Sequence, residues 1–192
     1  MIRGFSNRKG GIWYSIALNR EGKLLACAFS DRNRSEAQKA VTKSLPKALK
    51  GRLHWQRASS KYLPILISFY EGSGRKTDLR TVDLSGVSKF RGDVYNLLCK
   101  IPLGKVTTYG AIAKKLGGRR YSRAVGTAVA TNPLPLIVPC HRVVPCSLRV
   151  GNYGMCGRNP GKGGYMKQKL LRREGVMFEG ERVSKQSTWI PN

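Results

Sequence analysis

The chain has 192 residues, of which 41% are hydrophobic, and a formal net charge of +26 at pH 7. This length has room for one large or two small domains, each with its own core. No stretch is long and apolar enough to cross a bilayer, and residues 1–9 lack the apolar segment of a secretion signal, so we expect neither a membrane protein nor a secreted one. The positive charge predicts a polyanionic partner, with nucleic acid favoured over a membrane surface.

The cysteine pattern indicates free thiols. Five cysteines are an odd number, and the chain contains no Cys-x-x-Cys pair, which argues for a reducing compartment rather than a disulfide framework. The spacing of Cys140, Cys146 and Cys156 does not fit a structural zinc site, so no metal is expected. We expect a cytoplasmic, nucleoid-associated protein, or a nuclear one if the source is a eukaryote.

The first half of the chain predicts an α/β arrangement. Two β-rich runs, 12–18 and 23–29, flank a turn and favour a hairpin. Residues 35–50 have the composition of a helix, with Ser35 as a possible N-cap, although Pro46 makes the far end of this helix doubtful. The runs 63–70 and 79–84 are interpreted as further strands around a polar loop. This half shows no catalytic cluster, and His54 is interpreted as a packed or surface side chain.

From about residue 86 the pattern changes to short helices and loops. An apolar stripe at 3.6-residue spacing predicts a helix within residues 88–101. Two more short helices are predicted, at 107–116 after a threonine cap and from about residue 122 to 132, with Gly117 and Gly118 between them. Two short helices around a Gly-containing turn in a basic setting indicate a helix-turn-helix, although an ordinary helical hairpin gives the same pattern.

The second of these helices carries small residues around one long one. Ala124, Gly126 and Thr127 are small, whereas Arg123 is long. Readers of the major groove normally display several long polar side chains, which this helix lacks. A smooth face with one arginine suits close approach to the narrow minor groove, with Arg123 pushed into the base stack. Tight packing between helices explains the small residues equally well.

Cys140 stands beside His141 in a strongly cationic region. Residues 94–173 contain 15 Lys and Arg but no Asp or Glu, and the first acid after them is Glu174. Positive surroundings favour the thiolate, so Cys140 is a candidate nucleophile, with a structural buried cysteine as the alternative. Neighbours in an extended chain point to opposite sides, so a water molecule or a local turn would have to connect the two side chains.

The motif Pro-Cys-His-Arg-Val at 139–143 resembles the active-site motif of the O6-alkylguanine-DNA alkyltransferases. In the same order, segments 101–109, 122–126, 132–135, 150–153 and 170–175 are similar to that family's entry to the helix-turn-helix, recognition helix, hinge and two later signatures. The resemblance covers about residues 88–176. The sequence thus predicts an α+β protein with a small α/β scaffold domain over 1–85 and a mostly helical domain over 86–192, which carries the helix-turn-helix and the whole active site.

The resemblance implies a monomeric DNA repair protein without a cofactor, a methylated-DNA–[protein]-cysteine S-methyltransferase. Such a protein flips an alkylated guanine out of duplex DNA through the minor groove and moves the alkyl group irreversibly to its own cysteine, once per molecule. In the chemistry, the resemblance implies that Cys140 accepts the alkyl group, that His141 acts as a base through a water, and that Glu174 orients His141. It further implies that Asn132 is the hinge, that Tyr153 donates to the guanine, and that Lys167 and Gly154 support the pocket. Towards DNA, it implies that Arg123 is the finger, that Tyr109 rotates the phosphate, and that the DNA-facing surface consists of Ala124, Gly126 and Thr127.

One segment departs from the family pattern. Residues 154–164 stand where the family has a short Ser-Gly-Gly-type pocket loop, which leaves the pocket lid and the range of alkyl groups open. Two other functions remain as alternatives. A damage-binding module without chemistry would have its acceptor cysteine replaced, so Cys140 argues against it. A helix-turn-helix regulator with an incidental thiol is the third possibility.

Overall fold

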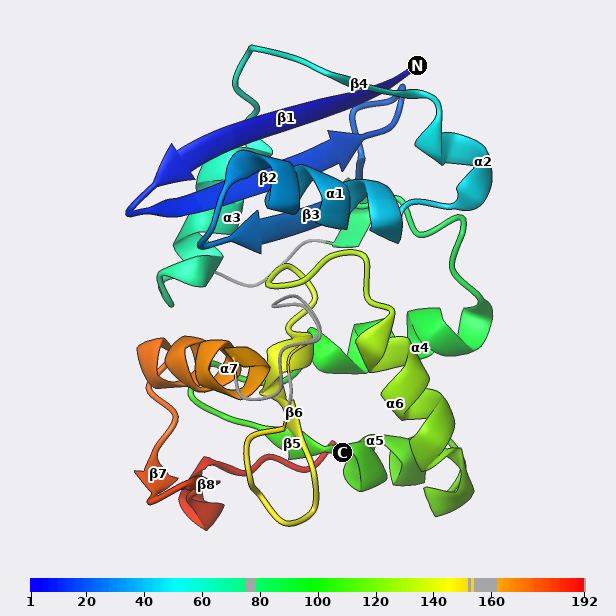
Figure 1. The fold of residues 1–192 in the computed structure, drawn as a ribbon. Coiled ribbons are helices and arrows are strands. Elements are labelled where there is room, and N and C mark those ends of the chain that lie inside the picture. Colours follow the sequence, from blue (N-terminus) through cyan, green and yellow to red (C-terminus); the bar gives the residue numbers. More distant parts are fainter. Residues whose placement is uncertain (75–78, 152, 154–161, 192) are drawn as a thin grey trace.

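The computed structural model describes residues 1–74, 79–151, 153 and 162–191, and places a sheet at one end of the molecule and most of the helices at the other (Figure 1). The sheet has the strand order β3-β2-β1-β4. Its strands are β1 (Ile2–Lys9), β2 (Ile12–Leu18), β3 (Leu24–Ser30) and β4 (Leu53–Trp55). The first three are antiparallel neighbours, whereas β4 lies parallel to β1.

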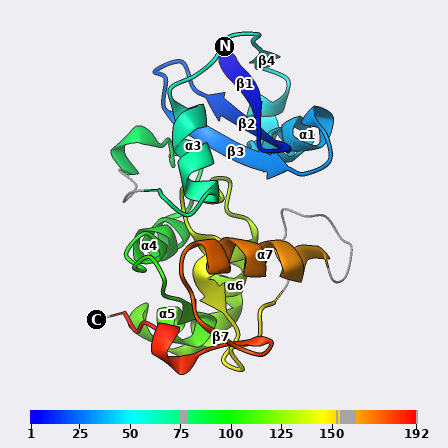
Figure 2. The same cartoon turned by 90° about the vertical axis from the view of Figure 1, so that its left-hand side faces the viewer.

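Helix α1 (Arg34–Ser44) covers one face of this sheet and α3 (Tyr62–Tyr70) covers the other (Figure 2). The inward residues of β2 and β3 therefore alternate between two cores. Ala17 and Ala26 pack against Val41 of α1, whereas Ile16 and Cys27 belong to the larger core that includes α3. Both faces of the sheet are thus buried, as expected for strands without polar alternation.

The predicted hairpin of β2 and β3 is confirmed, whereas other parts of the first half differ from the sequence prediction. Strand β1 was not predicted, although Gly10 and Gly11, with φ of 56° and 77°, form the kind of two-glycine turn that joins hairpin strands. The helix begins one residue earlier than expected, because the N-cap is Asn33, whose side chain accepts a hydrogen bond from the Glu36 amide. Pro46 divides it, and α2 (Lys47–Lys50) follows as a separate turn.

The run 63–70 is a helix, not a strand. Its β-rich composition was misleading, because its buried residues follow helical spacing and Pro64 lies in the first turn, where a helix tolerates proline. The run 79–84 is not a strand either: it begins with the 3-10 turn Leu79–Thr81 and touches the sheet through one bridge, between Val82 and Leu24.

The second half contains four α-helices within the described residues, α4 (Lys89–Leu98), α5 (Tyr109–Lys115), α6 (Ser122–Ala130) and α7 (Lys162–Arg173). Two short ladders accompany them: β5 (Thr107–Thr108) with β6 (Val143–Val144), and β7 (Phe178–Glu179) with β8 (Arg182–Val183). The remaining 3-10 turns are Arg119–Tyr121, Cys140–Arg142 and Lys185–Ser187. The α+β fold class is therefore confirmed.

Helices α5 and α6 form the predicted helical pair. The Thr108 hydroxyl caps α5 by accepting a hydrogen bond from the Ala111 amide at 3.1 Å. Gly117 and Gly118 have φ of 112° and 137°, a conformation open mainly to glycine, and the Gly118 amide donates to the Ala113 carbonyl at 2.9 Å. The chain therefore leaves α5 sharply and returns through the 3-10 turn to α6.

A single apolar cluster joins the two halves, running from Phe5 and Phe29 in the sheet to Leu98 and Leu170 in the helices. The backbone amide of Cys27 donates to the Pro133 carbonyl at 2.9 Å, and the Cys27 thiol donates to the Pro135 carbonyl at 3.2 Å. The boundary at residues 85 and 86 stays a prediction. The four described cysteines are free, and no described helix is long and apolar enough to cross a membrane.

Candidate active site and nucleic-acid interface

Cys140 is the first residue of the 3-10 turn Cys140–Arg142. The segment before it, 134–139, is buried, and the Cys140 amide donates to the Val138 carbonyl at 2.7 Å. Only 6% of Cys140 is exposed. The chain is therefore turned, not extended, at Cys140 and His141.

Asn132 holds this segment in place. Its side-chain Nδ2 donates to the Val138 carbonyl at 2.9 Å, and its Oδ1 accepts from the Leu134 amide at 3.0 Å. Between these two contacts Leu136 has φ of 73°, a left-handed conformation that bulky residues rarely adopt. The surroundings, and Asn132 above all, therefore fix the shape of the loop that carries Cys140.

Behind the thiol lies a buried chain of charged groups. His141 Nε2 lies 2.9 Å from Oε1 of Glu174, and Nδ1 of His141 has no hydrogen-bond partner among the described protein atoms. Arg142 donates to both carboxylate oxygens of Glu174, from Nε at 2.7 Å and from Nη2 at 2.9 Å. Burial alone would raise the pKa of Glu174, but the charges and hydrogen bonds of His141 and Arg142 outweigh it and lower that pKa to about 2. Glu174 is therefore ionised at neutral pH.

Burial raises the pKa of the Cys140 thiol above its ordinary value. Hydrogen bonds from Asn132 and Tyr153 and the charge of Lys167 act in the opposite direction without cancelling the effect of burial. Positive surroundings favour the thiolate, but burial has the larger effect here, because the surface lysines and arginines are too well solvated to offset the loss of water around the sulfur. The thiol needs a base when it reacts.

A cavity of about 440 Å³ opens above Cys140. The side chains that line this cavity come from several parts of the chain, and Cys140, Tyr153 and Lys167 are among them. The lining residues are Ala40, Lys43 and Ser44 from α1, Arg91 from α4, Tyr109 from α5, Gly126, Val129 and Ala130 from α6, and Thr131, Asn132, Pro135, Cys140, Tyr153 and Lys167. A cavity of this volume is of the size that takes a small organic ligand.

Lys167 is a cation inside the protein. It is 2% exposed, and its ammonium group donates to the Val143 carbonyl at 2.6 Å. Burial lowers the pKa of Lys167 to about 8, with the Cys140 side chain acting against that shift. A buried ammonium beside the thiol favours negative charge on the sulfur or on a ligand in the cavity.

The outer face of α6 carries the residues that the sequence assigns to DNA. Arg123, Ala124 and Thr127 are exposed, Gly126 is half-buried at the edge of the cavity, and Val125 and Ala128 are buried. This face is smooth apart from Arg123. Tyr109 lines the same cavity from the start of α5, so the helical pair and the thiol share one opening.

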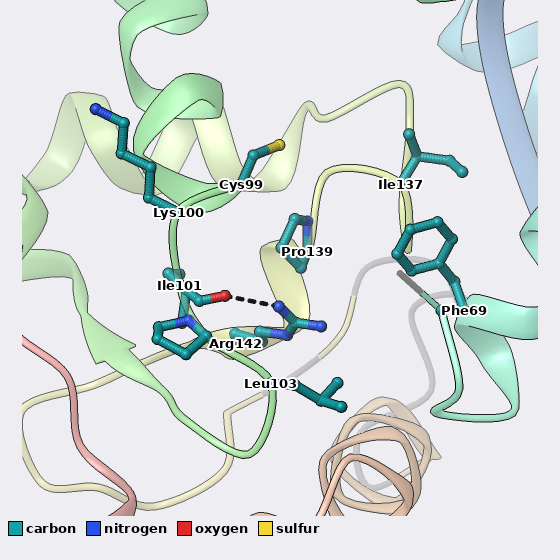
Figure 3. Close-up of a pocket in the computed structure, with 10 residues that line it drawn as sticks. Phe69, Cys99, Lys100, Ile101, Leu103, Ile137, Pro139 and Arg142 are labelled. Atoms are coloured by element: carbon teal, nitrogen blue, oxygen red, sulfur yellow. Dashed lines mark hydrogen bonds between the residues drawn. The ribbon is translucent and has the colours of Figure 1, made fainter. Parts of the chain in front are cut away.

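A second cavity, of about 300 Å³, borders Arg142 and does not include Cys140 (Figure 3). The figure shows the guanidinium of Arg142 donating to the Ile101 carbonyl, a contact of 2.8 Å from Nη1, with Pro139 and Ile137 beside it and Phe69 from α3. The guanidinium of Arg142 is therefore held by two partners, the Glu174 carboxylate and the Ile101 carbonyl, which follows α4.

Comparison with known proteins identifies the family. A model described as the DNA binding domain of 6-O-methylguanine DNA methyltransferase matches residues 89–176. The methylated-DNA–protein-cysteine methyltransferase of Archaeoglobus fulgidus is 42% identical over 105 residues, which are 54% of this chain and 68% of that protein. The chain belongs to the O6-methylguanine-DNA methyltransferase family.

Solved structures of this methyltransferase family extend the match to the first half. The O6-methylguanine-DNA methyltransferase of the archaeon Pyrococcus kodakaraensis superposes with a TM-score of 0.70 at 30% identity, covering 92% of this chain and 100% of that one. Mycobacterium tuberculosis OGT in complex with DNA superposes with a TM-score of 0.66 at 25% identity, covering 90% of this chain and 92% of that one. Matches to the curated relatives span between 52% and 68% of their length.

The structure brings most of the predicted site residues together. Cys140, Asn132, Tyr153, Lys167, Tyr109 and Gly126 line one cavity, and His141 and Glu174 lie in contact behind it. Gly154 and Cys156 lie outside the described residues. His54 is exposed on β4 and takes no part.

Two contributions were missed by reasoning from the sequence. Arg142, which shares Glu174 with His141, carried a signal in its position beside His141 within a region that has a single nearby acid. Three residues of α1, Ala40, Lys43 and Ser44, also line the cavity, so its lining is not confined to the second half of the chain. Nothing in the sequence of α1 marks them, because their place depends on how the halves pack.

Proposed function

We propose that the protein repairs O6-alkylguanine in duplex DNA by moving the alkyl group to Sγ of Cys140, once per molecule. The observation that carries this proposal is the position of Cys140 at the bottom of a cavity of about 440 Å³ that opens beside α6, next to His141, which is hydrogen-bonded to Glu174. The cavity accepts a base, and the helical pair lies next to its opening. Enzymes that act on one base of a duplex flip that base into such a pocket.

The transfer step replaces one bond to the alkyl carbon by another. Sγ of Cys140 attacks the alkyl carbon as the bond from that carbon to O6 of the guanine breaks. The thiol proton passes through a water molecule to Nδ1 of His141, whose Nε2 contacts the Glu174 carboxylate at 2.9 Å. Glu174 fixes the ring and stabilises the positive charge that develops on it, as the orienting acid does in a nucleophile–base–acid chain.

The departing guanine needs a proton, because it is a poor leaving group as an anion. The buried Tyr153 lines the cavity together with Cys140 and supplies the donor. His141 then releases its extra proton to water and Tyr153 regains one from water, so over the whole reaction the alkyl group replaces the thiol proton and the restored guanine carries a proton on its ring. The product is a thioether, and no described group of the site is suited to cleave its carbon–sulfur bond, so each molecule reacts once.

Contact with DNA is assigned to α5 and α6 through the minor groove. Arg123 is the long exposed side chain on a face of small residues, and it fills the gap that the flipped nucleotide leaves. Tyr109 is positioned to turn the phosphate of that nucleotide. Ala124, Gly126 and Thr127 allow the backbone of α6 to approach the groove. We propose that a monomer acts, in the compartment that contains the DNA.

Reaction with free O6-benzylguanine tests the chemistry without the DNA. The wild type is expected to gain one benzyl group on Cys140, and Cys140→Ala to gain none while it still binds duplex DNA. Wild-type protein that binds alkylated duplex but never gains mass would instead favour a damage-binding module without chemistry.

A further inference from the structure

A groove on the first half of the chain shares one lining residue with the active-site cavity. It has a volume of about 430 Å³ and is formed by the outer side of α1, the end of α2 and β4. Its described lining consists of Ser35, Gln38, Lys39, Thr42, Lys43, Lys50 and Trp55. We call this surface the α1 groove. Lys43 lines both the α1 groove and the cavity that contains Cys140, so the two hollows adjoin.

The α1 groove is strongly basic. Three of its described lining residues are lysines, all exposed, and none is acidic. Lys43 and Lys50 are in no ion pair among the described residues, and Lys39 has only an exposed contact of 3.7 Å with Glu36. Such an exposed pair contributes little and is easily exchanged for another anion. These charges are therefore available to a polyanion.

The floor of the α1 groove is fixed. Trp55 lies over Gly4 of β1, where even a Cβ would come within 2.6 Å of the indole ring. The amide of Gln38 donates to the Ser6 hydroxyl on β1 at 3.2 Å, which ties the helix to the same strand. The lysines thus rise from a rigid helix and a rigid floor. A preorganised surface loses less conformational freedom on binding than a mobile one.

We propose that the α1 groove binds the phosphate backbone of the duplex beside the flipped nucleotide, so that the first half of the chain is part of the DNA interface. This proposal rests on the function proposed above. A nucleotide in the cavity lies next to Lys43, and the phosphates that follow it along the strand meet Lys39 and Lys50 in turn. Neutralisation of phosphates by lysine releases counterions and strengthens binding at low salt. Tyr109 and Arg123 then act on the flipped nucleotide while the groove holds its flank.

The test compares two pairs of substitutions with the same loss of charge. Lys39→Gln with Lys50→Gln removes two groove charges that lie outside the Cys140 cavity. Lys61→Gln with Lys185→Gln is the control, since neither lysine lines the α1 groove or the Cys140 cavity: Lys61 precedes α3, which covers the opposite face of the sheet, and Lys185 begins the 3-10 turn Lys185–Ser187. All four side chains are exposed, so both variants are expected to keep the wild-type melting temperature.

The readout is the affinity for a duplex with one O6-methylguanine, measured over a series of salt concentrations, with Cys140→Ala added to every protein so that no methyl transfer consumes the lesion. We expect the slope of log affinity against log salt to shrink by about two for the groove pair and to stay at its wild-type value for the control pair. At about 0.1 M salt the groove pair is expected to bind at least about tenfold more weakly. Two further duplexes extend from the lesion in opposite directions. The groove pair should lose affinity for one of them and keep its affinity for the other.

Equal slopes for the groove pair and the control pair would overturn the proposal. So would an equal loss of affinity in Lys39→Arg with Lys50→Arg, because that pair keeps both charges. The failure of the proposed function looks different: wild-type protein would bind the duplex and leave Cys140 unmodified. Wild-type protein that alkylates Cys140 while the two glutamine pairs bind alike would refute the α1 groove alone.

Discussion

Glu174 is the residue on which the site's electrostatics depend. It contacts Nε2 of His141 at 2.9 Å and accepts two hydrogen bonds from Arg142, and all three side chains are buried. A buried carboxylate is stable only when its oxygens are paired in this way. One acid thus holds both the base of the reaction and the residue that follows it.

The Glu174→Gln variant should react more slowly with O6-benzylguanine, by on the order of a hundredfold. The amide keeps much of the shape but stabilises a charged His141 less, and it favours a different arrangement of the ring protons. The measurement is the rate of mass gain on Cys140. A rate equal to that of the wild type would show that Glu174 serves only the fold.

Glu174 also predicts how stability depends on pH. Its pKa is lowered from 4.5 to about 2, so its contribution to stability is fully present above the unfolded value of 4.5 and is lost as the pH falls toward 2. Wild-type protein should therefore exceed Glu174→Gln in free energy of unfolding by about 3–5 kcal/mol at neutral pH. The difference should narrow between pH 4.5 and 2. Chemical denaturation at several pH values gives both curves, and a gap that stays constant down to pH 2 contradicts the pairing.

At the scale of single elements, α6 combines a smooth face with one projecting side chain. The Arg123→Ala variant should lose much more rate on O6-methylguanine in a duplex than on free O6-benzylguanine, because only the duplex requires flipping and a side chain to fill the gap. Unstacking a base costs a few kcal/mol, so the loss on duplex is expected to be about tenfold or more. Equal losses on the two substrates would show that Arg123 does not act as the finger.

The start of α1 offers a test on stability. Asn33→Ala should lower the free energy of unfolding by about 1 kcal/mol, because the Glu36 amide loses its side-chain acceptor. Ser35→Ala, at the second residue of the helix, is the matched control, and it should change stability by less than about 0.5 kcal/mol. If thermal or chemical unfolding showed a larger loss of stability for Ser35→Ala than for Asn33→Ala, Ser35 would be the cap.

The elements show where reasoning from sequence succeeds and where it stops. The helical pair could be predicted because its signals are local: a threonine cap, two glycines and an apolar stripe. The run 63–70 could not be assigned from composition, since β-branched and aromatic residues also fill buried helices; Pro64 in the first turn was the better signal. Cys140 and His141 were found from the motif, whereas Lys43 reaches the cavity only through packing between distant segments.

In the whole molecule, the shared core and the charge of +26 both bear on the cavity: the core sets its position, and the charge sets the field around it. The cavity lies where the sheet half meets the helical half, and it takes residues from both. Cys27 of β3 bonds twice to the loop that leads to Cys140, so the sheet positions the reacting segment as well as supporting it. We expect the surplus of lysine and arginine to attract DNA to this junction.

The most direct test of the account is peptide mass spectrometry after incubation with a duplex that carries one O6-methylguanine. The account predicts one methyl group per active molecule, located on Cys140, with a burst equal to the amount of active protein and no reaction afterwards. Continued turnover, or the methyl group on Cys146 or Cys156, would contradict it.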